Sequence, residues 1–480
     1  MLLNAQKFLP MKKENRMNTN AQIMHSVIKK RNLWALISIT FVMGGCATFS
    51  KDGGFGGVQQ ITQQHINQEV AWPKSEAEKT KLDERIKALL AQRMDVEKAV
   101  QIALFNNKGL QASYYQLGIS EADVVQAGRL PNPKFSMLYA RNNGDYKIEQ
   151  ILTFNIFSLL TMPKMQEIER QRFVQTQKKT AFEVIKIANH TRIAYFNAVA
   201  ATEQVRYSEQ VKESAEASAE LARRMVKAGN FNKLQQAREQ SFYADAAFDY
   251  ASATNKQVSA YEALSRLLGV SVDQFNLEER LPDLPKSLTE LQPFEKAAFE
   301  QRLDLQAIRL ETDALAKQLG LTKTTRFINV LEIGPARVLE GRRGDPYKKG
   351  VELSFELPIF DWGTARVARA ESIYMQSVNR AAQLAIDAQS EIREAYNTYR
   401  TNYDMTKHLR DEIVPLRKKI LQENQLRYNG MLISPFELFG DARAQVTSVK
   451  SYIESLREFW VADSTLQMTL IGNENMIEGN

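Results

Sequence analysis

Very few side chains of this chain have the types and spacing that chemistry requires. Four histidines are scattered along the sequence, and no two stand at the i, i+4 spacing of a helical metal site. The single cysteine, Cys46, rules out an intrachain disulfide and a cysteine-based metal centre. The sequence contains no glycine-rich phosphate loop, no Gly-x-Ser-x-Gly elbow and no paired carboxylates with a histidine. We therefore expect neither catalysis nor a bound metal nor a diffusible cofactor.

One stretch, Gly350–Gly363, does place polar side chains regularly. Its apolar residues are Val351, Leu353, Phe355 and Leu357, and they alternate with Glu352, Ser354 and Glu356. A period of two predicts a strand with one apolar and one wet face, and Pro358 ends it because proline has no N–H to donate. A long helical pattern begins at about Thr364. Such a join is typical of a membrane barrel that continues as a helical tube.

The three polar residues of this strand are therefore expected to line the lumen of a barrel. The plain alternative is that they form the wet face of an ordinary strand. Arg366 and Arg369 follow the strand by a few residues. We interpret them as surface charges rather than as pore residues.

The N-terminal residues resemble the signal peptide of a bacterial lipoprotein. Lys29-Lys30-Arg31 is followed by an apolar run of 11 residues, 33–43, which is short for a membrane span but fits a signal peptide. Val42-Met-Gly-Gly-Cys46 resembles the lipobox, and this implies a lipid on Cys46 as the mature N-terminus. Ala47 after the cysteine implies sorting to the outer membrane. The alternatives are an ordinary signal peptide and an uncleaved anchor, and Met24 would start a signal of normal length.

The charge balance argues against a nucleic-acid partner. The formal net charge is +7, but seven basic residues and one acidic residue precede Cys46, so that this segment alone carries +6. Its removal leaves a mature chain near +1. A basic surface of the kind that nucleic acid requires is then absent.

The mature chain reads as a duplication of one unit. Ala103–Ala112 corresponds to Ala298–Ala307, and the turn glycine Gly229 corresponds to Gly430. Each half is expected to be mainly α with two strands, in the order helix, strand, strand, long helix, turn, long helix. The expected divisions are 1–45 (signal peptide), 46–82 (extended lipidated tether), 83–285 (first repeat, strands 134–142 and 147–159, hairpin 163–269) and 286–480 (second repeat, strands 326–339 and 348–358, hairpin 364–472).

Two strands per half give four strands per chain, which cannot close a barrel. An open sheet edge cannot lie in lipid, because its N–H and C=O groups would have no partners. Several copies must therefore share one barrel, and three copies supply twelve strands. The long helix that opens at Pro163 meets no Gly or Pro until Gly229, so it extends for roughly 100 Å.

From about residue 90 to residue 472 the chain resembles the TolC-like outer-membrane efflux proteins, and specifically their lipoprotein branch serving RND-type drug or metal efflux. The motifs that carry this resemblance are Gly350–Gly363, Leu130-Pro-Asn-Pro133, Arg302-Leu-Asp-Leu305 and Tyr428-Asn-Gly430. The family usually has Pro at the position of Leu303. The resemblance implies a homotrimer with a twelve-stranded barrel and a helical tunnel, lipid-anchored in the outer membrane. It also implies two partners, a periplasmic adaptor and an inner-membrane pump.

The resemblance also implies a periplasmic gate of acidic side chains just after the second hairpin turn. In this chain Glu437 and Asp441 stand there at i and i+4, on one helix face. Three copies of each would form stacked acidic rings that favour cations. The alternative is a solvated helix start, where an acidic residue is favoured in any case.

Two other functions stay open at this point. A periplasmic membrane-fusion adaptor lipoprotein also carries a lipidated cysteine and a coiled-coil hairpin, but generally has one hairpin between β-rich domains. A structural lipoprotein made of coiled coil is the other alternative, and the alternating strands argue against it. The exported solute, whether a drug, a metal ion or another molecule, is open in each case.

Overall fold

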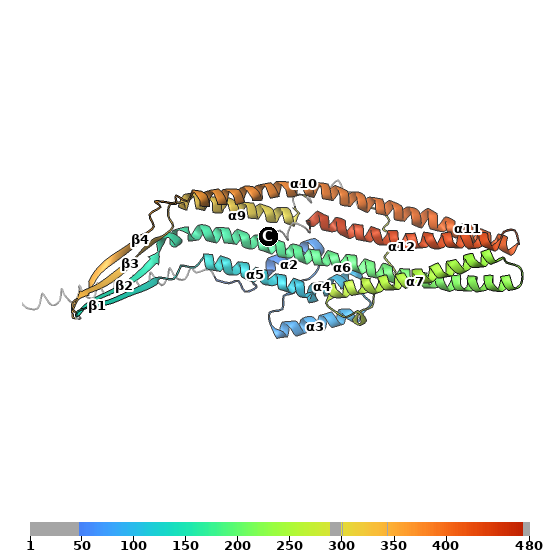
Figure 1. Cartoon of the computed structure of the whole chain (residues 1–480), viewed down its shortest axis with the longest axis horizontal. Helices are drawn as coiled ribbons and strands as arrows, with labels where there is room; N and C mark the ends of the chain where they lie inside the picture. Colours follow the sequence, from blue (N-terminus) through green and yellow to red (C-terminus); the bar gives the residue numbers. More distant parts are fainter. Residues whose placement is uncertain (1–47, 289–298, 300, 343, 474–480) are drawn as a thin grey trace, which may run out of the picture.

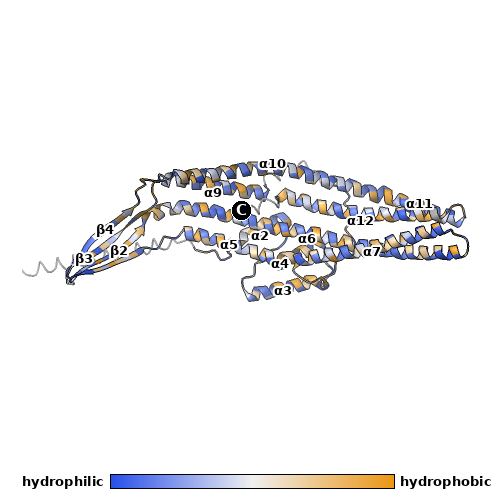
Figure 2. Ribbon diagram, viewed as in Figure 1, coloured by the Kyte–Doolittle hydropathy of each residue, from blue (hydrophilic) through white to orange (hydrophobic). Residues whose placement is uncertain are grey.

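A computed structural model describes residues 48–288, 299, 301–342 and 344–473. The molecule is elongated, with a β-sheet at one end and the tips of two helical hairpins at the other (Figure 1). Helices dominate the fold, which confirms the expected mainly α class with a small β part. Figure 2 shows apolar and polar residues interleaved along the long helices rather than gathered in one long apolar segment.

The first half of the chain contains six helices and two strands within the described residues. In order they are α2 (Phe55–Ile66), α3 (Glu76–Leu90), α4 (Val96–Asn106), α5 (Lys108–Ala127), β1 (Lys134–Asn142), β2 (Asp145–Asn155), α6 (Ile156–Lys227) and α7 (Lys233–Leu268). A short 3-10 helix, η2 (Val272–Gln274), follows them.

The second half repeats this order from its first described helix onward. Its elements are α9 (Leu303–Thr325), β3 (Leu331–Gly341), β4 (Lys348–Phe355), α10 (Thr364–His408), the π-helical turn η3 (Leu409–Ile413), α11 (Val414–Asn429) and α12 (Pro435–Ile471). Pro415 is the second residue of α11, two positions after the end of the π turn. The sequence predicts a kink near Pro415, and a π turn beside a proline is a recognised cause of one.

The four strands form one antiparallel sheet in the order β1-β2-β3-β4. The β1–β2 turn is built by Asn143 and Gly144, both with positive φ, as a two-residue hairpin requires. The pairing of β2 with β3 joins the two halves, with Ile151 opposite Ala336. Gly334 sits at this junction because a Cβ there would lie 1.7 Å from the carbonyl oxygen of Leu152.

The helix α6 is the long axis of the molecule, with 72 residues and a length of roughly 110 Å. It packs against α7, α9, α5 and α12. Its buried positions include many small side chains, among them Ala181, Ala188, Ala198, Ala215 and Ala219. Small residues at these positions allow close approach of the neighbouring helix.

The strand and helix boundaries differ from expectation at the β2–α6 join. The sequence predicts a strand to Leu159 and a helix that opens at Pro163. The structure ends β2 at Asn155 and begins α6 at Ile156, with Pro163 inside the helix. The reason is local: the Asn155 side chain accepts a hydrogen bond from the Ser158 N–H at 2.8 Å and so caps the helix there. The second half also shifts, since β3 begins at Leu331 rather than at 326.

The prediction of an extended tether over residues 46–82 is wrong for the residues described. Helix α2 and the first half of α3 lie in this segment. Phe55 and Val58 are buried against Tyr114 and the α6 helix, and the Phe55 and Tyr114 rings meet edge to face at 4.8 Å. Buried aromatic contacts of this kind stabilise the segment. The sequence did not predict this helix because the glycines around Phe55 interrupt the spacing of apolar residues.

Candidate functional site

The sheet presents one apolar face to the outside of the chain. Val351 is 72% exposed and Leu353 is 58% exposed, although both are large apolar side chains. The strand register places further exposed apolar residues on the same face, namely Phe355, Ile333, Phe154, Phe135 and Tyr139. An apolar surface of this extent on a single chain marks a face that meets lipid or another protein.

The opposite face of the sheet is polar. The register puts Glu352 and Ser354 on this face, with Ser354 opposite Glu332. The Lys134 Nζ lies 2.6 Å from a Glu332 carboxylate oxygen across the sheet. Glu356 follows the last residue of β4 and is exposed. The structure therefore brings Glu352, Ser354 and Glu332 to one face but leaves Glu356 just beyond the strand.

Each outer strand of the sheet pairs on one side only. Within the described chain, β1 bonds to β2 and β4 bonds to β3, so one edge of β1 and one edge of β4 have no strand neighbour. Two open edges in one sheet are sites for pairing with another strand.

The segment between β4 and α10 is a sharp junction with exposed aromatic side chains. Phe360 is 98% exposed, and Trp362 meets Phe327 edge to face at 6.2 Å. Gly363 has a φ of +72°, and a Cβ there would lie 2.5 Å from the Arg326 carbonyl oxygen. Only glycine fits this turn. The first half has no such junction, because α6 follows β2 directly.

The two hairpin tips lie together at the far end of the molecule (Figure 1). At the first tip Gly229 has a φ of +79°, as expected for the turn residue. At the second tip Gly430 has a φ of −83° and caps α11, while Met431 takes the left-handed conformation with a φ of +59°. The second turn therefore does not use its glycine in the way that the repeat predicts.

Glu437 and Asp441 lie in the first turns of α12, beside the second tip. Glu437 is exposed, whereas Asp441 is half-buried. The Asn424 side chain of α11 donates a hydrogen bond to the Asp441 carboxylate. The two carboxylates stand one turn apart on one helix, but only Glu437 is free to face solvent in the isolated chain.

A buried ion pair that the sequence did not indicate joins the two hairpins near their tips. Glu239 of α7 is 1% exposed, and its carboxylate accepts hydrogen bonds from Arg443 Nη2 at 2.8 Å and from Ser218 Oγ at 2.9 Å. The Arg443 guanidinium also stacks over the Phe242 ring, 4.5 Å from its centroid. Arg443 stands two residues after Asp441, yet nothing local in the sequence points to a partner some 200 residues away.

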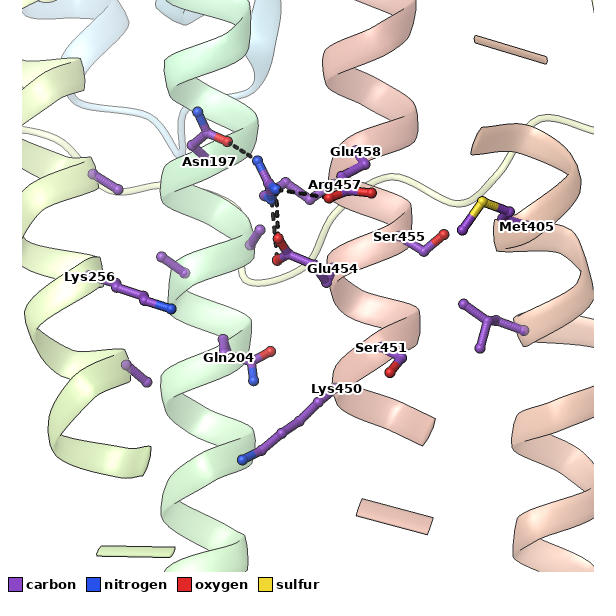
Figure 3. A pocket seen from close by; sticks show the side chains of 15 residues that line it. Asn197, Gln204, Lys256, Met405, Lys450, Ser451, Glu454, Ser455, Arg457 and Glu458 are labelled. Carbon is purple, nitrogen blue, oxygen red and sulfur yellow. Dashed lines mark hydrogen bonds and ion pairs between the residues drawn. The ribbon is translucent and has the colours of Figure 1, made fainter. Parts of the chain in front are cut away.

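A second link between the hairpins lies in a cleft of about 650 Å³ between α6, α7, α10 and α12. Figure 3 shows Arg457 of α12 reaching the Asn197 side chain of α6, at 3.0 Å. The same guanidinium is 2.6 Å from Glu454. Within this cleft the contact between Arg457 and Asn197 therefore links α12 of the second hairpin to α6 of the first.

Cys46 and the segment that the sequence predicts to be a signal peptide lie outside the described residues. The first residues that are described already contact the helices, since the Ser50 N–H donates to Glu121 of α5 at 2.6 Å. Among the residues described, no group of three or more His, Cys, Asp or Glu side chains has the arrangement of a metal site. The helices in the described part of the chain do not include one with the length and apolar character of a membrane span.

The sequence matches a protein-family model and a curated relative. The family model described as outer membrane efflux protein matches residues 99–270. The cobalt-zinc-cadmium resistance protein CzcC of Cupriavidus metallidurans is 22% identical over 271 residues, which are 56% of this chain and 64% of CzcC. The match thus spans slightly less than two thirds of that curated relative.

Solved structures share the fold. A membrane protein from Pseudomonas aeruginosa has a TM-score of 0.68 at 17% identity, covering 78% of this chain and 93% of that chain. The channel protein CusC has a TM-score of 0.64 at 19% identity, covering 79% and 92%. The MtrE outer membrane channel of Neisseria gonorrhoeae has a TM-score of 0.63 at 16% identity, covering 81% and 89%. The chain is thus similar to outer membrane efflux proteins over residues 99–270, and it shares its fold with these solved membrane proteins.

Proposed function

We propose that this protein is the outer-membrane channel of a tripartite efflux system, a passive trimeric conduit that exports small solutes. The observation that carries this proposal is the four-stranded sheet, which is apolar on one exposed face, polar on the other and open at both edges. Such a sheet is stable in lipid only when further strands close it into a barrel.

Three copies of the sheet make a barrel of twelve strands. The strands have 8 to 11 residues, and a tilted strand that crosses a bilayer needs about 9 to 11. The apolar face that includes Leu353 then meets lipid. The polar face with Glu352 and Ser354 lines the lumen, and the exposed Phe360 and Trp362 lie at the boundary where aromatic side chains are favoured.

The helices continue the barrel as a tunnel into the periplasm. The length of α6 sets the distance from the sheet to the hairpin tips, and α6 is long enough to cross much of the periplasm. At the tips we propose that Glu437 and Asp441 of three chains form the narrow, acidic end of the conduit. The exposure of Glu437 supports this assignment, and rings of carboxylates favour cations.

We further propose that Cys46 carries a covalent lipid and anchors the chain in the outer membrane. The close packing of α2 and of Ser50 against α5 and α6 supports a short connection from this anchor to the helices. Replacement of Cys46 by Ala is expected to remove the lipid. Loss of the acyl mass from the mature N-terminus in mass spectrometry checks this, and an unchanged mass would reject the anchor.

The conduit supplies no energy of its own and catalyses no reaction. We propose that it works with a periplasmic adaptor and an inner-membrane pump, which select the solute. CzcC is named for cobalt, zinc and cadmium resistance, and this supports divalent cations as one class of exported solute; drugs are the other class that the family serves. The pump and adaptor that co-purify with the protein will identify the class.

Reconstitution of the detergent-purified protein in a planar bilayer tests the proposal. A trimeric mass in detergent together with stable single-channel conductance is the expected result. A membrane-fusion adaptor would give a different result, because it has no barrel and therefore no conductance. A monomer without conductance would reject the conduit.

A further inference from the structure

A cleft of about 550 Å³ lies below the sheet, between α6, α9 and α10. Its lining combines apolar side chains, such as Phe157 and Met165, with three arginines, Arg172, Arg366 and Arg369. None of the described residues that line it is acidic. The volume is within the range of about 300–1,000 Å³ that is usual for small-molecule sites.

Two of the three arginines have no carboxylate partner. Arg172 is neutralised, since its guanidinium is 2.6 Å from Glu169 and also donates to Gln318. Arg366 donates to the carbonyl oxygen of Arg326 at 2.9 Å, which leaves its charge uncompensated. Arg369 is exposed and has no ion pair within the described part of the chain. The cleft therefore holds a net positive charge beside an apolar surface.

The contacts of α6 show which side of the helical wall carries the cleft. Helix α2 lies on the face of α6 that bears Phe173 and Gln177, where the Gln177 side chain donates to the Gly54 carbonyl oxygen at 2.8 Å. A helix turns by about 100° per residue. The cleft residues Met165 and Arg172 are therefore roughly 80–140° around α6 from that face.

Helix α9, a second neighbour of α6, contacts another part of the α6 surface. Helix α9 contacts α6 through Gln171, which donates to Asp313 at 3.1 Å, and Lys317 of α9 is 3.0 Å from Glu167. Gln171 and Glu167 are roughly 100–140° around α6 from Arg172, and Arg172 itself reaches Gln318 of α9. A separate cleft, between α9 and α10, is lined by Arg309 and Asp313.

The inference that the arginine cleft faces the lumen of the tunnel rests on the proposed conduit. Helix α2 follows the lipidated Cys46 by only nine residues, so α2 must lie on the outer surface of the tunnel. The arginine cleft is on the other side of the wall and faces the lumen. The sequence led us to interpret Arg366 and Arg369 as surface charges rather than as pore residues, and the luminal orientation proposed here departs from that interpretation.

We propose that this cleft is a binding site for amphiphilic organic anions in the lumen, just below the barrel. The guanidinium groups of Arg366 and Arg369 bind the anionic group, because the planar fork of arginine matches carboxylate, sulfonate and phosphate oxygens. The apolar side chains, including Ile373, hold the hydrophobic body. Three copies of the cleft face the same lumen, so the tunnel is electropositive here and acidic at its tip.

Binding is measured by isothermal titration calorimetry on the purified full-length protein, with protein-free detergent as the blank. The probes are 2-naphthalenesulfonate, inorganic sulfate as the anionic group alone and 1-naphthylmethylammonium as the cationic counterpart. The variants are Arg366→Gln with Arg369→Gln, the same pair changed to Lys, and Arg309→Gln. The last removes one positive charge from the opposite side of the α9–α10 pair and is the matched control.

We expect 2-naphthalenesulfonate to bind about tenfold more weakly or worse to the double Gln variant. The double Lys variant keeps the positive charge but lacks the planar fork, so its affinity is expected to lie between those of the double Gln variant and the unmodified protein. The Arg309→Gln control is expected to stay within about threefold of the unmodified protein. Equal affinity in the double Gln variant, with the trimer intact, would overturn the site. Equally tight binding of sulfate would overturn the amphiphilic class, and equally tight binding of the ammonium probe would overturn the preference for anions.

The binding measurement does not depend on conductance, so it is separate from the test of the conduit. Binding as expected in a protein that fails to conduct would overturn the conduit and the luminal position while supporting the anion site. Conductance without binding would support the conduit and overturn the anion site.

Discussion

Replacement of Leu353 by Arg puts a charge in the middle of the face that we assign to lipid. Leu353 lies in β4 opposite Ile333, and 58% of its surface is exposed in the isolated chain. The matched control is Ser354→Arg, one residue along the same strand. Ser354 points to the polar face, where its cross-strand neighbour is Glu332. The two variants carry the same charge at almost the same height and differ only in the side of the sheet.

The expected cost follows from the position of the side chain. An arginine on the lipid face of a barrel costs about 2–4 kcal/mol near the membrane midplane, and far less on the luminal face. Three copies in the proposed trimer raise the cost to about 6–12 kcal/mol per assembly. Even the lower value for one chain corresponds to roughly a 30-fold loss of correctly inserted protein. The Ser354→Arg variant is expected to lose little, since Glu332 can pair with the new charge.

The assay compares both variants with the unmodified protein for insertion into lipid vesicles. Folding in vesicles over a urea series gives the free energy of unfolding, and planar-bilayer recording gives the conductance of what inserts. We expect Leu353→Arg to insert poorly and Ser354→Arg to insert normally with altered ion selectivity. Equal insertion of both variants, or a larger loss for Ser354→Arg, would refute the assignment of the two faces.

Three further predictions concern the helical part. Joint replacement of Glu437 and Asp441 by Ala should raise single-channel conductance and weaken cation preference; unchanged values of both would reject the acidic gate. Arg443→Ala leaves the Glu239 carboxylate buried with only Ser218 as a side-chain donor. The loss in stability should be about 1–3 kcal/mol, which thermal unfolding measures. Adding Glu239→Gln to this variant should recover part of the loss, and no recovery would contradict the pairing. Burial raises the pKa of Asp463 to about 6, so its protonated form is favoured in the folded state and stability is lost as the pH rises from about 4 through 6. Asp463→Asn should therefore stabilise the protein by about 1–3 kcal/mol at pH 8 and hardly at all at pH 4, and the same gain at both pH values would rule out titration as the cause.

The two faces of the sheet were predictable from the sequence because the alternation of a strand is a local property. Val351, Leu353 and Phe355 share a face in any strand, whatever it pairs with. The long helices were also predictable, because no breaker interrupts them and their small residues recur at helical spacing. The residues at which these elements begin and end were less predictable. The Asn155 cap ended β2 four residues early, since one side-chain hydrogen bond outweighed the apolar run after it.

The sequence by itself therefore determined the types of most elements after residue 82 and the apolar side of the strands, since each depends on neighbours a few residues apart. Only the tertiary structure decided how α2 folds onto α6, that Met431 rather than Gly430 takes the left-handed turn, and that Glu239 meets Arg443. It likewise decided that Arg366 and Arg369 share a cleft with α6. These arrangements join residues tens to hundreds of positions apart, and their free energy comes from packing and pairing between elements. No periodicity within a single segment carries that information.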